Sequence, residues 1–230
     1  MKWNIINFDT LESTNTTALS YPVYSIIRAA SQTAGKGRFG RTWESPKGNL
    51  YASFILPDLG NKSALVSFII ALSAGQMLSQ ITTGISLKWP NDILLNGKKI
   101  AGILLEKAEN KLIVGIGINL ISHPQHTVLY PTTSLKTTFD ATEVLHKLID
   151  AFDKNLLLYN QQGFTPIQKA WKEMATGIGT PIEVRLPTQT LAGIFTDLDE
   201  TGALLLKTPT GIIPVLAGDV FFTQQKESND

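Results

Sequence analysis

The last part of this chain differs from the rest in its pattern of predicted secondary structure, and this difference constrains the fold most. The change falls at Gly177-Ile178-Gly179, after which short β-rich runs follow one another, with turns such as Glu200-Thr201-Gly202 and Pro209-Thr210-Gly211 between them. Short strands packed this closely along a chain are typical of a small barrel. The pattern predicts a larger domain at residues 1–178 and a small β-barrel domain at residues 179–230. The expected barrel strands cover residues 181–186, 190–197, 203–207, 212–216 and 220–223.

The larger region mixes helix and strand signals. Asp140 and Gly163 are suitable cap and stop residues for its longest helix, and Asn96-Gly97 predicts a hairpin turn. Strands that pair locally, with helices not strictly alternating, predict an α+β fold with a mixed or antiparallel sheet and flanking helices. Apolar periodicity places the helices at residues 63–81, 140–162 and 166–174. The expected strands lie at residues 24–30, 50–56, 85–89, 93–95, 101–107 and 111–119.

Composition excludes several classes of protein. None of the 230 residues is a cysteine, which removes disulfides and thiolate chemistry and is compatible with a reducing cytoplasm. The formal net charge of +1 gives no general reason for nucleic-acid or membrane binding. Residues 1–9 do not resemble a signal peptide, and the apolar stretch at 65–78 is too short and too polar to span a bilayer. We expect a soluble cytoplasmic protein.

A glycine-rich basic segment at residues 32–43, Gln-Thr-Ala-Gly-Lys-Gly-Arg-Phe-Gly-Arg-Thr-Trp, is the most informative for function. Its glycines let backbone amides approach a ligand, and Lys36, Arg38 and Arg41 direct positive charge at an anion. It matches neither a Walker loop nor a dinucleotide-binding GxGxxG. Taken alone, the segment could also be a mobile basic surface loop.

Three further segments carry polar groups at strand ends. Lys88-Trp89-Pro90-Asn91-Asp92 brackets a rigid Trp-Pro pair with a lysine and a carboxylate, which suits a nucleotide and its Mg²⁺ but also a structural turn with a surface ion pair. Lys98 and Lys99 are adjacent, so only one of them can face inward on a strand. Gly102 allows a ligand to lie against its strand, and residues 114–120 place two glycines on one strand face.

The order and spacing of these segments resemble the biotin–protein ligase family over nearly the whole chain. The matching motifs are Ser13-Thr14-Asn15, the glycine-arginine loop, Lys-Trp-Pro-Asn-Asp, Lys-Ile-Ala-Gly and Gly-Ile-Asn, followed by the C-terminal barrel. The resemblance implies a fold like that of class II aminoacyl-tRNA synthetases and biotin ligases, with an SH3-like barrel. It is similar to the short form of the family, since Ser13 lies too near the start for an N-terminal DNA-binding domain. We therefore expect no repressor activity.

The resemblance also implies roles for individual residues. Lys99 and Arg38 would be catalytic, with ATP, Mg²⁺ and biotin as ligands, and Asp92 would hold the metal. Biotin would be bound by Ser13, Thr14, Asn15, Gln32, Gly35, Lys36, Gly37, Arg38, Lys99 and Gly102. The nucleotide would be bound by Arg38, Arg41, Trp43, Lys88, Asn91, Asp92 and Asn119.

The implied reaction joins biotin to ATP as biotinyl-5′-AMP and passes it to a lysine of a biotin carboxyl carrier protein, with the enzyme a monomer or homodimer. The chain departs from the family at Lys36, where the loop usually has arginine; lysine keeps the charge but loses the planar fork. A lipoate or octanoate ligase on a related fold and a non-catalytic adenylate-binding module are alternatives. A zinc enzyme built on His123 and His126 lacks further clustered ligands.

Overall fold

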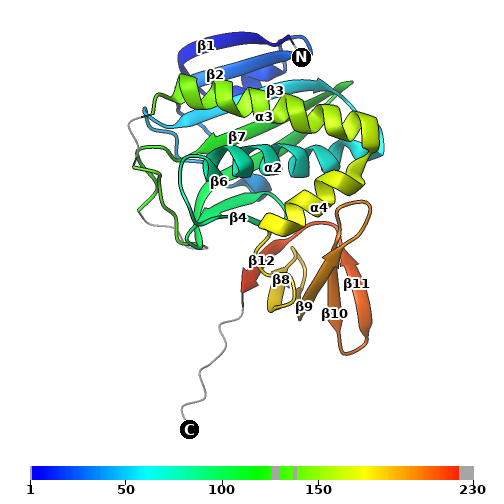
Figure 1. The fold of residues 1–230 in the computed structure, drawn as a ribbon. Coiled ribbons are helices and arrows are strands. Elements are labelled where there is room, and N and C mark those ends of the chain that lie inside the picture. The colour runs from blue at the N-terminus through cyan, green and yellow to red at the C-terminus, as the bar shows by residue number, and fades with distance from the viewer. Residues whose placement is uncertain (1, 126–129, 137–138, 223–230) are drawn as a thin grey trace.

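A seven-stranded mixed sheet forms the centre of the protein (Figure 1). The computed structural model describes residues 2–125, 130–136 and 139–222. The strands run in the order β1-β2-β3-β7-β6-β5-β4, and only the β1–β2 pair is parallel. The bounds are β1 Asn4–Leu11, β2 Ser25–Gln32, β3 Leu50–Pro57, β4 Ile85–Lys88, β5 Asp92–Leu95, β6 Lys98–Ala108 and β7 Lys111–Ile118. This arrangement confirms the predicted α+β class.

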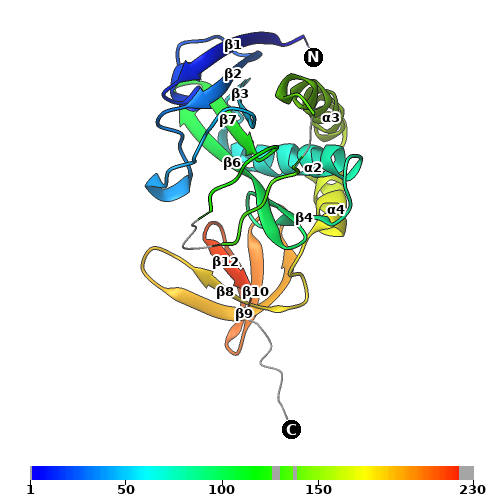
Figure 2. The ribbon, with the colours of Figure 1, turned by 90° about the vertical axis from the view of Figure 1, so that its left-hand side faces the viewer.

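Three helices cover one face of this sheet: α2 (Val66–Ser79), α3 (Ala141–Gln162) and α4 (Phe164–Met174) (Figure 2). All three were predicted, and Asp140 and Gly163 flank α3 as expected. Together with the short 3₁₀ helix Gly60–Leu65, α2 forms a helical stretch of 20 residues that is long and apolar enough to cross a membrane. The prediction that this stretch is too short and too polar to span a bilayer is therefore wrong on length and composition. Burial of 78% of the most apolar window instead identifies a core helix.

The opposite face carries the short helix α1 (Thr14–Ala18), which packs Ala18 against Ile27, Ile55 and Ile113. Neither α1 nor β1 was predicted as an element. Ser13 occupies the N-cap position of α1. β1 is an edge strand without a fully buried residue, so its sequence lacks the alternation of a half-buried strand.

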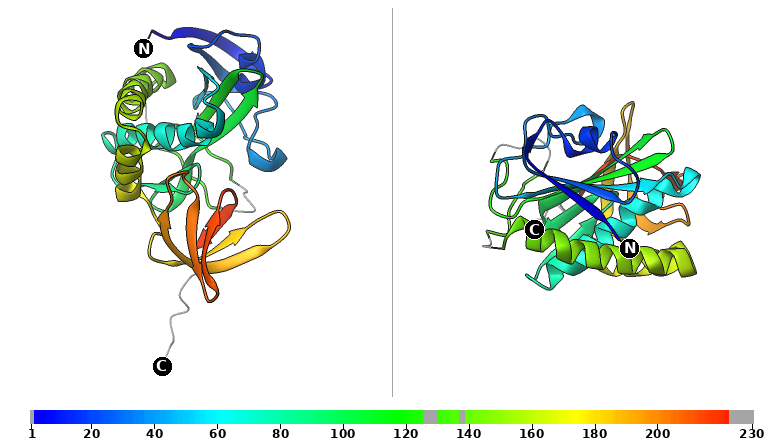
Figure 3. Two further views of the ribbon diagram at one scale, coloured as in Figure 1. Left: turned by 90° about the vertical axis from the view of Figure 1, so that its right-hand side faces the viewer. Right: turned by 90° about the horizontal axis from the view of Figure 1, so that it is seen from above.

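The second sheet has five antiparallel strands in the order β11-β10-β9-β8-β12 and lies below the first in Figure 1 and in the left view of Figure 3. Its strands begin and end within one residue of the predicted positions: β8 Pro181–Arg185, β9 Thr190–Leu198, β10 Leu204–Thr208, β11 Gly211–Val215 and β12 Asp219–Phe222. This is the expected SH3-like barrel. Trp89 Nε1 donates to Gly202 O at 3.0 Å and anchors it to the first sheet. The domain boundary between residues 178 and 179 stays a prediction.

Candidate active site

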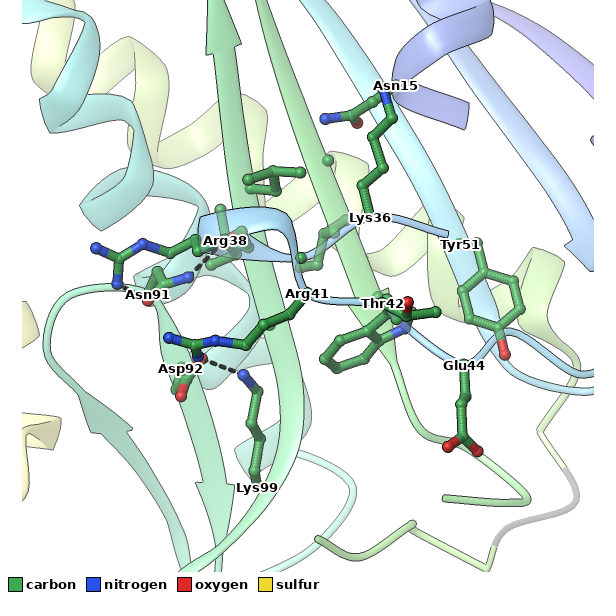
Figure 4. Close-up of a pocket in the computed structure, with 18 of the residues that line it drawn as sticks. Asn15, Lys36, Arg38, Arg41, Thr42, Glu44, Tyr51, Asn91, Asp92 and Lys99 are labelled. Atoms are coloured by element: carbon green, nitrogen blue, oxygen red, sulfur yellow. Dashed lines mark hydrogen bonds and ion pairs between the residues drawn. The ribbon is translucent and has the colours of Figure 1, made fainter. Parts of the chain in front are cut away.

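A cavity of about 570 Å³ opens on the face of the large sheet that α1 shares. All predicted site residues line it except Gly35, Lys88 and Asn119. Figure 4 shows Asn15 at one end and Arg41, Asp92 and Lys99 gathered toward the other. The cavity thus has a polar end at Asn15, toward which Figure 4 shows the Lys36 side chain extending, and a cationic end where Arg41 and Lys99 gather beside Asp92. The lining residues that the sequence did not predict are Thr42, Glu44, Tyr51, Ile103, Leu104, Gly115, Ile116, Gly117, Pro124, Tyr130, Thr132 and Asp219.

The basic segment at residues 35–43 forms an arm that is held by its own backbone hydrogen bonds. Trp43 N donates to Gly35 O at 2.9 Å and Gly37 N donates to Arg41 O at 2.7 Å, so the segment folds back on itself as a short hairpin. Its tip turns through Phe39 and Gly40, which both have positive φ (56° and 71°). Gly40 adopts this conformation without strain, whereas Phe39 does not. The turn places Arg38 Cζ and Arg41 Cζ 4.8 and 5.3 Å from the centroid of the exposed Phe39 ring.

A bulge in β6 brings Lys99 to the cavity. Residues 99 and 102 differ in parity, so regular alternation would place them on opposite faces of the strand. The register with β5 shifts between Ile93 and Leu94, and Ile100 is left without a partner on β5. Lys99 and Gly102 therefore both face the cavity, while Lys98 is exposed as expected for the outward member of the pair. Lys99 Nζ lies 2.6 Å from Asp92 Oδ1.

Glycines make the floor of the cavity, but protein side chains fill the space above them. A Cβ on Gly117 would lie 2.4 Å from Trp43 Nε1, and one on Gly102 would lie 3.0 Å from the Trp43 ring. A Cβ on Gly115 would lie 2.3 Å from Asn15 Oδ1. We expected Gly102 to admit a ligand; in this structure it admits the Trp43 indole and the end of Lys99. The glycines therefore set the depth at which the lining side chains lie.

Hydroxyl and amide groups gather at the polar end around Asn15. Thr14 donates to Gln32 Oε1 through both its backbone N–H, at 2.8 Å, and its hydroxyl, at 3.1 Å. Gln32 Nε2 donates to Ser45 Oγ at 2.8 Å. Ser13, Thr14 and Asn15 are all buried because α1 presses them against the sheet. Groups held in this way offer fixed donors and acceptors to a ligand.

The small barrel contributes to the cationic end. Arg41 forms an ion pair with Asp219 at the start of β12. Arg38 Nη1 donates to Gly218 O at 3.2 Å and to Asn91 Oδ1 at 3.1 Å. Burial lowers the pKa of Arg38 from its ordinary value, and the carboxylates of Asp219 and Asp92 oppose this effect. The lining of the cavity is therefore shared between the large domain and the barrel.

The three predicted site residues that do not line the cavity, Gly35, Lys88 and Asn119, contact other parts of the protein. Lys88 is buried, and its Nζ lies 3.2 Å from the centre of the Tyr130 ring, which itself lines the cavity. Burial lowers the pKa of Lys88 to about 8, although Asp92 opposes the shift. Asn119 donates to Thr133 O at 3.1 Å, and a Cβ on Gly35 would lie 2.3 Å from Trp43 O.

The donor set near Asp92 fits Mg²⁺ only in part. Within residues 2–125, 130–136 and 139–222, no three His, Cys, Asp or Glu side chains cluster as a metal site. His126 lies outside the described residues. Mg²⁺ is commonly held by one or two carboxylates together with substrate phosphates, and Asp92 suits that arrangement. A dedicated protein cage for the metal is not present in the described part of the chain.

Some unpredicted lining residues carried a weak signal. Asp219 is the first residue of β12 and directly follows Gly218, a position at which an acidic residue is common and predicts no function. Tyr130 stacks on Phe221 with ring centroids 5.0 Å apart, a contact between positions 91 residues apart in sequence, and neither has a local pattern around it. The sequence predicts that Gly115 and Gly117 lie on one face of their strand, and both line the cavity.

Comparison with known proteins gives this fold and site a class. A model of the biotin/lipoate A/B protein ligase family matches residues 8–121, and one of the biotin protein ligase C-terminal domain matches residues 177–223. A protein ligase is thus the class that fold and cavity define. A biotin–[acetyl-CoA-carboxylase] ligase of Paracoccus denitrificans is 36% identical over 85% of this chain and 89% of its own. The chain belongs to the biotin protein ligase family.

Two further relatives agree. The bifunctional ligase/repressor BirA of Bacillus subtilis is 36% identical over 96% of this chain and 74% of its own length. The biotin protein ligase of Aquifex aeolicus, solved in complex with biotin and ATP, is 30% identical and superposes with a TM-score of 0.85 over 96% of this chain and 99% of its own.

Proposed function

We propose that this ligase attaches biotin to a lysine of a biotin carboxyl carrier protein, using ATP and a biotinyl-5′-AMP intermediate. The observation that carries the proposal is the division of one cavity into a hydroxyl-rich end and a cationic end. Biotin itself is divided in this way, since its ureido ring offers one acceptor and two donors and its tail ends in a carboxylate. The Aquifex aeolicus relative was solved with biotin and ATP together.

The ureido ring fits the polar end around Asn15. Ser13, Thr14, Asn15 and Gln32 line that end and carry both donors and acceptors. The backbone of the arm at residues 35–38 would close over the thioether ring. The carboxylate tail would then point along β6 toward Lys99.

Adenylation brings two anions together at the cationic end. A carboxylate oxygen of biotin attacks the α-phosphorus of ATP, a new C–O–P linkage forms, and the bond to the leaving pyrophosphate breaks. Lys99, Arg38 and Arg41 would offset the repulsion between the carboxylate and the phosphates, an effect that grows in a site that excludes water. Mg²⁺ held by Asp92 and the phosphates would neutralise charge on the leaving pyrophosphate. Trp43 would cover the adenosine. Lys88 would affect the nucleotide only indirectly, because its ammonium group contacts the ring of Tyr130, which lines the cavity.

The second step transfers the biotinyl group. The lysine amine of the carrier attacks the carbonyl carbon of the mixed anhydride, AMP leaves with the electron pair of the broken C–O bond, and the nitrogen loses a proton. A free adenylate would hydrolyse or acylate lysines at random, so the arm at residues 35–43 must keep it enclosed until the carrier arrives. The contacts of Arg38 and Arg41 with Asn91, Gly218 and Asp219 hold the arm over the cavity.

Two other functions are less consistent with the site. A lipoate or octanoate ligase needs a long apolar tunnel, whereas the end of this cavity away from the cations is lined by hydroxyls and amides. A non-catalytic module would not need Lys99 and two arginines around one space. Repressor activity is not part of the proposal, because the net charge of +1 gives little general attraction for the phosphates of DNA.

Transfer to a carrier tests this proposal. The protein is incubated with biotin, ATP, Mg²⁺ and a biotin carboxyl carrier domain, and the carrier is followed by intact-mass spectrometry. We expect one biotinyl group per carrier and none on a carrier whose acceptor lysine is replaced by arginine. Lipoyl or octanoyl transfer in place of biotinyl transfer would contradict the proposal.

A further inference from the structure

Glu106, on β6, does not line the cavity but contacts Asn15, which lines its polar end. Glu106 has no role in the scheme above. Asn15 Nδ2 donates to Glu106 Oε2 at 2.7 Å. A carboxylate accepts hydrogen bonds and cannot donate them, so this contact fixes which way the Asn15 amide faces. The Asn15 oxygen is thereby turned toward Ser53.

Ser53 passes this orientation on. It is fully buried, and its Oγ lies 2.6 Å from Asn15 Oδ1 and 2.8 Å from Thr14 Oγ1. A serine hydroxyl has one hydrogen, and the Asn15 oxygen can only accept. The hydrogen of Ser53 is therefore committed to Asn15, and Ser53 offers Thr14 a lone pair.

The other neighbour of the Thr14 hydroxyl is also an acceptor. Gln32 Oε1 lies 3.1 Å away, and the Gln32 amide is held in this orientation because its Nε2 donates to Ser45 Oγ at 2.8 Å. Ser45 in turn donates to Trp43 O at 2.8 Å. The single hydrogen of Thr14 thus stays within the protein, and Thr14 presents only lone pairs to the cavity.

We propose that Glu106 is a positioning residue that makes Thr14 a hydrogen-bond acceptor toward the cavity, and so selects a ligand with an N–H group at that point. The inference rests on the proposed function, which places the ureido ring of biotin there. Asn15 and Ser53 connect Glu106 to Thr14, and none of the three needs to touch the reacting atoms.

Replacing Glu106 by glutamine would release this constraint. A glutamine can donate to Asn15 Oδ1, which lets the Asn15 amide turn its N–H₂ toward Ser53. Ser53 could then donate to Thr14, and only the longer contact, with Gln32 Oε1 at 3.1 Å, would still compete with a ligand acceptor for the Thr14 hydrogen. The variant therefore tolerates a ligand acceptor where the wild-type protein requires a donor.

Calorimetric binding of three ligands tests the proposal. They are biotin and the two carbamate analogues in which one or the other ureido N–H is replaced by a ring oxygen of nearly the same size. One of the two carbamates has its ring oxygen at the position of the N–H that faces Thr14. We expect the wild-type protein to bind biotin about 100-fold more tightly than this isomer, since an unpaired buried acceptor costs about 1–3 kcal/mol. In Glu106→Gln this ratio should fall below about tenfold, with the KM for ATP unchanged. Glu109→Gln, an exposed change in the turn after β6, should keep the wild-type ratio.

A purely structural role for Glu106 gives a different result. It would lower the melting temperature and weaken all three ligands alike, leaving the ratio unchanged, and that outcome overturns the proposal. In a Ser53→Ala background the connection to Thr14 is missing, so adding Glu106→Gln should change the ratio by less than about twofold. An equal effect of Glu106→Gln in both backgrounds also overturns it.

Folding failure and failure of the proposed function are separable from these results. If Glu106→Gln does not fold, Ser53→Ala alone should lower the ratio, because Thr14 then loses one of its two acceptors; an unchanged ratio contradicts the proposal. A wild-type protein that binds none of the three ligands contradicts the proposed function and this inference together. A wild-type protein that binds biotin without discriminating against either carbamate contradicts the inference alone.

Discussion

Arg41 on the arm and Asp219 on the barrel form an ion pair across 178 positions of sequence. The pair joins the arm to the barrel in the lining of the cavity, beside the hydrogen bond from Arg38 to Gly218 O. The barrel is therefore part of the site. Its contribution is to hold the arginines of the arm where a nucleotide phosphate would lie.

Breaking this ion pair should loosen the arm. In Asp219→Asn, we expect amide hydrogen exchange at residues 36–42 to accelerate by up to about fivefold, because a partly exposed pair contributes at most about 1 kcal/mol. Raised salt should reduce the difference between the variant and the wild-type protein. Glu183→Gln removes the carboxylate of a second pair on the barrel, with Arg185 at 3.9 Å, and serves as the control. Equal exchange in wild-type and Asp219→Asn proteins would show that the pair does not restrain the arm.

Removing the amine of Lys99 should mainly affect adenylation. We expect Lys99→Ala to lower biotin-dependent pyrophosphate exchange by about 10²–10³-fold, the cost of losing one donor to a transition-state charge. Lys98→Ala is a matched control on the same strand, since Lys98 is exposed. Near-wild-type exchange in Lys99→Ala would reject the assignment of Lys99.

Replacing Arg38 by glycine should let the adenylate escape from the site. Arg38→Gly removes the contacts with Asn91 and Gly218 that hold the arm, so adenylate should escape and biotinylate lysines on unrelated proteins. Labelling of a bystander protein such as serum albumin, detected with streptavidin, measures this. Unchanged selectivity would count against an enclosing role for the arm.

Burial of Lys88 should give the protein a pH-dependent stability. Its folded-state pKa of about 8 is below the unfolded value of 10.5, so the unfolded state binds more protons between these limits. The destabilisation caused by charged Lys88 is thus fully present below pH 8 and disappears as the pH rises toward 10.5. Lys88→Met should be more stable than wild type at pH 7, by an amount on the order of 3 kcal/mol less the lost contact with Tyr130. Urea unfolding of both proteins from pH 7 to 10 checks this, and a constant difference would contradict it.

Much of the fold was predictable because the relevant signals are local. The barrel strands lie within one residue of their predicted positions because each is bounded by turn residues that act within a few positions. Helix α3 was equally clear, since Asp140 and Gly163 mark its ends. β1 was missed because it lies at the sheet edge without a strong apolar face, and its parallel pairing with β2 has no local signature.

The site was predictable in membership but not in geometry. The motifs identified about half of the lining residues, because these residues occur in a few recognisable segments. The bulge that aims Lys99 at the cavity depends on pairing between β5 and β6, and no local pattern indicates it. Asp219 and Tyr130 come from distant segments, so only the folded chain brings them to the same space. Lys88 and Asn119 were assigned to the nucleotide, but their side chains lie outside the lining.

Biotin-dependent exchange of labelled pyrophosphate into ATP tests the central claim most directly, because only an enzyme that forms an acyl-adenylate reversibly catalyses it. The assay is run with biotin, lipoate and octanoate in turn, each with ATP and Mg²⁺. We expect exchange with biotin and none above background with the other two acids. Exchange with lipoate but not with biotin would contradict the account.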